Sequence, residues 1–160
     1  LRKLLNEGKV TDKHLEQLRH QLVNALEYIQ ENHIVHPPLR AENIIFTENI
    51  GNLKLIDVGF EQRPSLSPQS ISDDIFNYGT VLTEVLDAMG STDATLRRVA
   101  RKCTDPSPAK RYRDLQQLHL ALEGRTNKWP YILLGVFMAV MLLLVLWLES
   151  PYRPIPAYGG

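Results

Sequence analysis

Apolar residues recur at the spacing of an amphipathic helix in four segments of the chain, which is the main sequence signal for helices. These segments predict helices over residues 12–32, 74–90, 96–103 and 114–123. Thr11 can cap the first helix and Gly124 can end the last one, as residues of these types commonly do. The expected core-facing residues are Leu15, Leu18, Leu22, Ala25, Leu26, Ile29, Val81, Leu82, Val85, Leu86, Leu96, Val99, Ala100, Cys103, Leu115, Leu118 and Leu122.

Two short apolar runs, 44–46 and 53–56, have the length and composition of strands. They flank Asn49-Ile50-Gly51-Asn52, a sequence typical of a tight turn, so together they predict a small β-hairpin. Residues 61–72 are polar and rich in Pro and Ser, which predicts a loop. The expected fold class is therefore mainly α with one small hairpin.

The most hydrophobic stretch, residues 129–148, contains no charged side chain. A helix of that length covers ~30 Å, the thickness of the hydrocarbon core of a membrane. Trp129 and Tyr131 lie near one end, and Trp147 and Tyr152 near the other, as in an aromatic belt. We predict one transmembrane helix here, followed over residues 149–160 by a short disordered tail with too little apolar surface to fold alone.

The charges that flank this helix predict its orientation. Arg125 and Lys128 precede it in a basic juxtamembrane linker, residues 125–128, whereas only Arg153 follows it. Because positive residues remain on the cytoplasmic side, we expect a single-pass membrane protein with a cytoplasmic folded domain. The tail should then lie on the opposite side.

The overall formal charge is zero, so nucleic acid is not an expected partner. Residues 97–128, however, include nine basic residues and three acidic ones. This stretch either contacts anionic lipid headgroups or forms an ordinary solvated face, and both interpretations remain open. Cys103 is the only cysteine, which excludes an intrachain disulfide.

Residues 36–43 read His-Pro-Pro-Leu-Arg-Ala-Glu-Asn, and Asp57-Val58-Gly59 follows. This order resembles the catalytic loop His-Arg-Asp-Leu-x-x-x-Asn and the metal-binding loop of the protein kinase family. Two further partial motifs, at residues 74–79 and 105–111, follow in the family's order. The resemblance implies that residues 1–124 form a kinase-like C-terminal lobe. This would be a partial domain, because these residues include no N-lobe with its Gly-rich loop and phosphate-binding lysine.

Pro38 stands where the family has its catalytic aspartate. That aspartate accepts the proton of the substrate hydroxyl, whereas a proline ring accepts none, so the resemblance implies no catalytic residue here. It places Asn43 and Asp57 at the two magnesium-ligand positions. They either hold a magnesium–nucleotide complex together with an N-lobe or serve the hydrogen bonding of the loop. We favour the second interpretation and expect no cofactor unless an N-lobe is present, in which case Mg-ATP would be the ligand.

The resemblance assigns structural roles to His36, Asp74 and Arg111. His36 should make a hydrogen bond within the loop, and Asp74 should accept backbone N–H groups from it. No Ala-Pro-Glu sequence occurs between Gly59 and Asp74, so Arg111 lacks the glutamate partner that the family provides.

These observations favour a membrane-anchored, pseudokinase-like module that acts as a scaffold without phosphotransfer. Its expected partners are membrane lipid and a protein that the sequence does not identify. Loss of the base should slow phosphotransfer by about 10²–10⁴-fold. The alternatives are an active serine/threonine kinase whose N-lobe lies upstream, or a protein that binds ATP without transferring phosphate.

Overall fold

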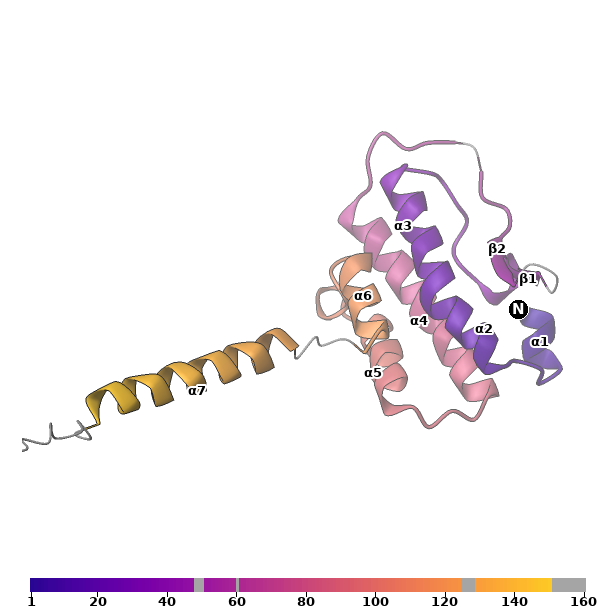
Figure 1. The fold of residues 1–160 in the computed structure, drawn as a ribbon. Helices are drawn as coiled ribbons and strands as arrows, with labels where there is room; N and C mark the ends of the chain where they lie inside the picture. Colours follow the sequence, from indigo (N-terminus) through magenta and orange to yellow (C-terminus); the bar gives the residue numbers. More distant parts are fainter. Residues whose placement is uncertain (48–50, 60, 125–128, 151–160) are drawn as a thin grey trace, which may run out of the picture. The chain divides into compact units, whose positions relative to one another are not determined.

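The computed structural model describes residues 1–47, 51–59, 61–124 and 129–150 (Figure 1). The chain forms two compact units, Leu1–Arg125 and Thr126–Gly160. The predicted linker, 125–128, and most of the predicted tail, 151–160, lie outside the described residues, as do hairpin residues 48–50.

The first unit is mainly helical and contains one hairpin, which confirms the predicted fold class. Its elements, in chain order, are α1 (Arg2–Asn6), α2 (Asp12–Gln17), the π-helical turn η1 (Leu18–Leu22), α3 (Val23–Glu31), the 3₁₀ turn η2 (Ala41–Asn43), β1 (Ile44–Thr47), β2 (Asn52–Leu55), α4 (Pro68–Ala88), α5 (Ala94–Cys103), the 3₁₀ turn η3 (Pro108–Lys110) and α6 (Leu115–Leu122).

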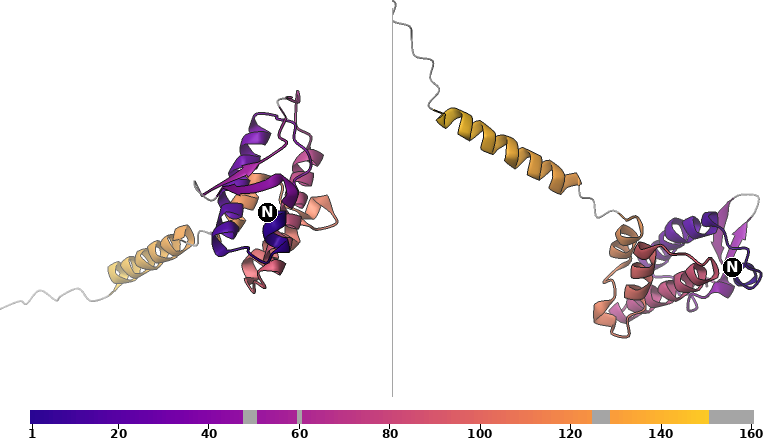
Figure 2. Two further views of the ribbon diagram at one scale, coloured as in Figure 1. Left: turned by 90° about the vertical axis from the view of Figure 1, so that its right-hand side faces the viewer. Right: turned by 90° about the horizontal axis from the view of Figure 1, so that it is seen from below.

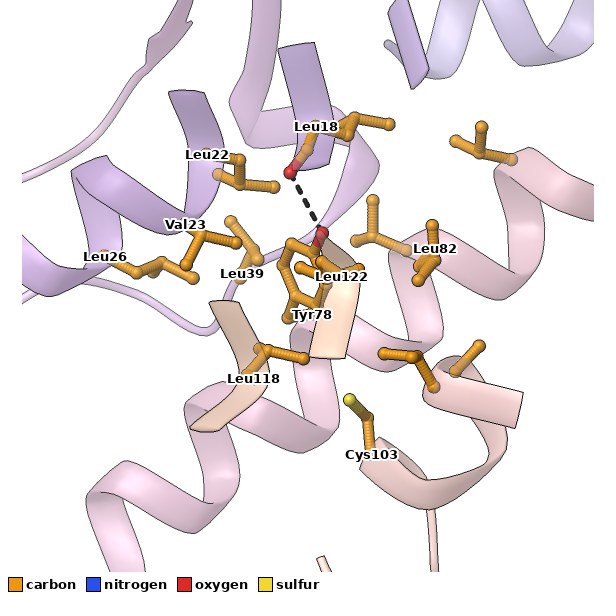
Figure 3. Close-up of a cluster of buried hydrophobic side chains, with 14 of the residues drawn as sticks. Leu18, Leu22, Val23, Leu26, Leu39, Tyr78, Leu82, Cys103, Leu118 and Leu122 are labelled. Atoms are coloured by element: carbon orange, nitrogen blue, oxygen red, sulfur yellow. Dashed lines mark hydrogen bonds between the residues drawn. The ribbon is translucent and has the colours of Figure 1, made fainter. Parts of the chain in front are cut away.

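The first predicted helix is present but not uniformly α-helical. It consists of α2, η1 and α3 in direct succession, with a π-helical turn at its centre. The Tyr78 hydroxyl of α4 donates a hydrogen bond to the Leu18 carbonyl within that turn, at 2.9 Å (Figure 3). A side chain that bonds to a helix carbonyl is a recognised cause of local departure from α geometry. The periodicity of the sequence does not reveal this departure because the donor comes from another helix.

The hairpin lies where the sequence predicts it, with antiparallel pairing from Ile44↔Leu55 to Thr47↔Asn52. Ile44 is fully buried, whereas its neighbour Ile45 is exposed. This alternation is that of a strand pair with one face on the core.

The helix α4 begins six residues earlier than predicted, at Pro68 instead of Asp74. The hydroxyl of Ser67 accepts a hydrogen bond from the Ser70 backbone N–H at 3.1 Å. Serine is a favoured N-cap and proline a favoured first residue of a helix. The composition of residues 61–72 suggested a loop throughout, but Ser-Pro at this point starts a helix.

The hydrophobic core gathers around α4. Figures 1 and 2 show α4 crossing the lobe beside α2–α3, with α5 and α6 nearby, and α4 makes contacts with both α5 and α6. All the predicted core residues are buried except Leu15 and Ala25, which are partly buried. Figure 3 shows several of them around Tyr78.

The second unit contains one described helix, α7 (Trp129–Glu149). Its segment Pro130–Glu149 is long and apolar enough to cross a membrane, and none of that segment is buried within the protein. An isolated apolar helix in water would leave a large hydrophobic surface uncovered.

Candidate functional site

The loop that carries the kinase-like motif joins α3 to η2 and is anchored from within. Leu39 is only 4% exposed and Ala41 is fully buried, so the loop is fixed to the core at two points. Pro38 lies just before this anchor and is exposed. The residue at the position of the family's base therefore faces solvent and offers neither a donor nor an acceptor side chain.

His36 has oxygen acceptors at both ring nitrogens. Its Nδ1 lies 2.8 Å from the Pro37 carbonyl oxygen, and its Nε2 lies 3.2 Å from Oδ1 of Asp74. Neither acceptor carries a proton, so both contacts are hydrogen bonds only when the imidazole is doubly protonated. The bond to Asp74 accordingly raises the pKa of His36 above its usual 6.5, against the opposing effects of burial and of Arg63.

Asp74 receives side-chain donors from two directions. Gln30 Nε2 donates to its Oδ2 at 3.0 Å, and His36 approaches its Oδ1. The resemblance implied backbone N–H donors from the loop, but none to Asp74 occurs among the described hydrogen bonds. Pro37 and Pro38 have no N–H to donate. In this chain the carboxylate holds the loop through the His36 ring.

Asn43 directly precedes β1, and Asp57 follows β2 by two residues, at the open end of the hairpin. The backbone N–H of Ile56 donates to the Asn43 carbonyl at 2.9 Å, one position beyond the Ile44↔Leu55 pair. The amide of Asn43 reaches the Pro38 carbonyl at 3.5 Å, which is long for a hydrogen bond. Asp57 is exposed and has a φ of 63°, a left-handed conformation that aspartate tolerates better than most residues.

Arg111 joins the start of α4 to the segment between α5 and α6. Its Nε donates to the Asp105 carbonyl at 2.8 Å, and its Nη1 donates to the Ser72 hydroxyl at 3.1 Å. The guanidinium also lies 4.6 Å from the centre of the Phe76 ring, within cation–π range. These groups serve as its partners in a chain without the family's glutamate.

A hollow of about 190 Å³ opens beside the loop, lined among others by His36, Pro38, Arg63 and Asp74. Ligand pockets for drug-sized molecules are usually larger, at about 300–1,000 Å³. The hollow brings the predicted residues His36, Pro38 and Asp74 together. It does not include Asn43, Asp57 or Arg111 among its lining residues.

Gln30, a donor to Asp74, and Arg63, a charged neighbour of His36, belong to this site although the sequence did not indicate them. Gln30 lies on the polar face of α3, where nothing distinguishes it from its solvated neighbours. Arg63 is located in a loop and reaches the Ser70 hydroxyl at 3.3 Å. The only indication of such residues is a general rule: Asp74 is buried, and a buried carboxylate needs hydrogen-bond donors around it.

Comparison with known proteins supports the kinase resemblance. Residues 1–72 match the family model described as the protein kinase domain. The chain is 39% identical over 56 residues to serine/threonine-protein kinase ppk25 of Schizosaccharomyces pombe, a match that covers 35% of this chain and 13% of that protein. It is 37% identical over 59 residues to serine/threonine-protein kinase KIC1 of Saccharomyces cerevisiae, covering 37% and 5% respectively.

The chain also matches a putative serine/threonine-protein kinase of Mycoplasma genitalium over a longer stretch, with 26% identity over 116 residues. This match covers 69% of this chain and 29% of that protein, so the chain spans less than a third of the length of each of these relatives. The order of elements in the first unit and the family match over its first 72 residues agree. Both findings fit a fragment of the protein kinase family, and the fold of this unit is that of a kinase-like C-terminal lobe.

Proposed function

We propose that this chain is a membrane-anchored module of the protein kinase family that binds other proteins and does not transfer phosphate. The observation that carries the proposal is the exposed Pro38 at the position of the catalytic base. The residues on either side of it are anchored: Leu39 is buried and His36 is paired with Asp74. The loop therefore keeps a defined shape while lacking the group that accepts the hydroxyl proton.

The apolar helix α7 supports the anchoring part of the proposal. Its length and composition suit a membrane span, and the charges on its two sides favour a lobe on the cytoplasmic side. An anchored lobe without catalytic chemistry can still recruit a protein partner to the membrane, which is the role we assign to it. Membrane lipid is then its second partner.

Phosphotransfer measured on the complete protein that contains this chain tests the proposal. We expect no turnover of Mg-ATP above background, and no change on Asp57→Ala, because the base is missing whether or not the metal position is occupied. Turnover that Asp57→Ala abolishes would contradict the proposal. Pro38→Asp provides the converse test, since phosphotransfer that appears only in this variant would locate the defect at that position. A restored base contributes about 10²–10⁴-fold in rate.

A second candidate function is nucleotide binding, with or without phosphate transfer. It is favoured by the presence of Asn43 and Asp57 at the family's two metal-ligand positions, next to the hydrogen bond that joins Ile56 to Asn43. If this function applies, Mg-ATP should raise the unfolding temperature of the complete protein, and Asp57→Ala should remove the increase. An unchanged unfolding temperature would exclude it.

A further inference from the structure

A cluster of histidine and glutamate side chains lies away from the loop, where η1 meets α6. One ligand atom each from His20, His119 and Glu123 lies within 4.8 Å of the other two. The side chains of His20, His119 and Glu123 are 40%, 25% and 27% exposed, respectively. The cluster is therefore partly buried by the two elements but open to small solutes.

The sequence brings these residues together by helical spacing. His119 and Glu123 are four residues apart at the end of α6, and Glu16 and His20 are four residues apart on α2 and η1. Residues at this spacing share one helix face. Because α6 and η1 contact each other, the two pairs face one another, and the two imidazole centres lie 6.3 Å apart.

Further carboxylates orient both rings. The Nε2 atom of His119 lies 3.2 Å from Glu123, while its Nδ1 atom lies 3.5 Å from Glu27 on α3. His20 Nε2 lies 2.7 Å from Glu16. A metal-binding histidine usually donates its other ring N–H to a carboxylate, a backbone carbonyl or water, and Glu27 is placed to accept that bond from His119. Arg19 also pairs with Glu16, at 3.0 Å, so we do not count Glu16 as a ligand.

We propose that His20, His119 and Glu123 form a zinc site that ties η1 to α6. Two imidazoles and one carboxylate suit zinc, which binds such ligands at about 2.0–2.2 Å and completes a tetrahedron with water. Ligand atoms around such an ion are about 3.3 Å apart. The three ligand atoms lie within 4.8 Å of one another, so they need to approach by about 1.5 Å to bind zinc. Rotation of the side chains supplies a movement of this size. Glu27 would then accept the Nδ1 proton of His119.

The site has a structural consequence for the lobe. The site links η1, in the first long helix of the lobe, to α6, the last helix of the lobe. These two elements are about a hundred residues apart in the chain. A ligand that binds only the folded state stabilises it in proportion to the logarithm of its concentration over the dissociation constant. Zinc should therefore raise the unfolding temperature of the lobe. This inference is independent of whether the lobe transfers phosphate.

Calorimetric titration of zinc into the complete 160-residue chain, treated with chelator and held in detergent micelles, tests the proposal. We expect one zinc ion per chain with a dissociation constant in the micromolar range or lower. His20→Gln and His119→Gln should each weaken binding by at least tenfold. Glu27→Gln should weaken it by about 10–100-fold, the effect typical of a carboxylate that supports a ligand histidine.

His33→Asn is the matched control, because His33 lies outside the cluster and asparagine tolerates its φ of 53°. It should bind zinc as the unsubstituted chain does. Cobalt(II) provides a readout that needs no variant, since a tetrahedral site produces an intense visible absorption that octahedral cobalt in solution lacks. The proposal fails if cobalt produces no such band, if zinc does not bind, or if the control loses zinc as readily as His119→Gln does.

Discussion

At the scale of single residues, His36 couples the stability of the lobe to pH. Its two hydrogen bonds require the protonated ring, and the bond to Asp74 raises its pKa above 6.5. The stabilisation is therefore complete below about pH 6.5 and is lost as the pH rises through the folded-state value. Two charged groups face the ring: Asp74, which raises the pKa of His36, and Arg63, which lowers it.

Urea unfolding of the chain at about pH 5.5 and about pH 8.5 checks this prediction. We expect the part of the free energy of unfolding that depends on His36 to fall between the two. His36→Gln should remove that part, and Asp74→Asn should do the same because the ring loses its charged partner. The pH dependence of the His36→Gln variant must be subtracted from that of the unsubstituted chain, because other histidines titrate as well. Burial lowers the pKa of His14, so His14 changes the free energy of unfolding with pH in the opposite direction. An identical pH dependence in His36→Gln would refute the assignment.

At the scale of secondary-structure elements, the contact between α4 and α5 depends on one glycine. A Cβ built on Gly79 would lie 2.3 Å from Cys103 Cβ and 3.2 Å from the Ala100 carbonyl oxygen. Neither atom is at the end of a flexible side chain, so the helices would have to move apart. Gly79 is thus the residue that lets the backbones of α4 and α5 approach so closely.

Gly79→Ala should destabilise the lobe even though alanine favours helices. Overpacking of a core costs about 1–3 kcal/mol, whereas replacing glycine by alanine in a helix returns about 1 kcal/mol. Because the added Cβ would lie only 2.3 Å from Cys103 Cβ, the cost belongs at the upper end of that range, and we expect a net loss of about 2 kcal/mol, measured as a lower urea midpoint at constant slope. Thr80→Ala, at the next and exposed position of α4, is the control and should change stability little. A Gly79→Ala variant as stable as the control would disprove the close contact.

At the scale of the whole molecule, the proposed function requires α7 to cross a membrane with the lobe on the cytoplasmic side. The only native cysteine, Cys103, is fully buried, and burial raises its pKa to about 12. It is therefore a poor nucleophile. A single added cysteine then reports its own location to a maleimide that does not cross membranes.

The proposed orientation predicts that Gly159→Cys is labelled on intact cells, whereas Lys54→Cys in the lobe is labelled only after the membrane is permeabilised. The reverse pattern would invert the orientation. Val140→Arg, near the middle of α7, should reduce insertion, because a central arginine costs about 2.5–3.5 kcal/mol. The same change at the exposed Leu120 of the lobe should leave insertion unaffected, and equal effects of the two substitutions would refute the span.

The residues that the sequence grouped by motif differ in how far the structure brings them together. His36, Pro38 and Asp74 line one hollow, whereas Asn43 bonds through its carbonyl to Ile56, the residue before Asp57. Arg111 lies elsewhere, at Ser72 and Asp105. The order of motifs along the chain identifies such residues, but their mutual contacts depend on how the helices pack.

Local patterns in the chain were sufficient for the hairpin, the apolar helix and most of the helical residues of the lobe, because periodicity and turn residues act over a few positions. They did not reveal α1 or the first six residues of α4. The amino acid at position 38 by itself carries the proposal that the base is missing, since no fold gives a proline ring a proton acceptor.

Only the tertiary structure determined the π-helical turn at Leu18, the pairing of His36 with Asp74, the close approach at Gly79 and the meeting of His20 with His119. Each joins residues that are far apart in the chain. Such contacts follow from the packing of whole helices around α4, and no short stretch of sequence encodes them.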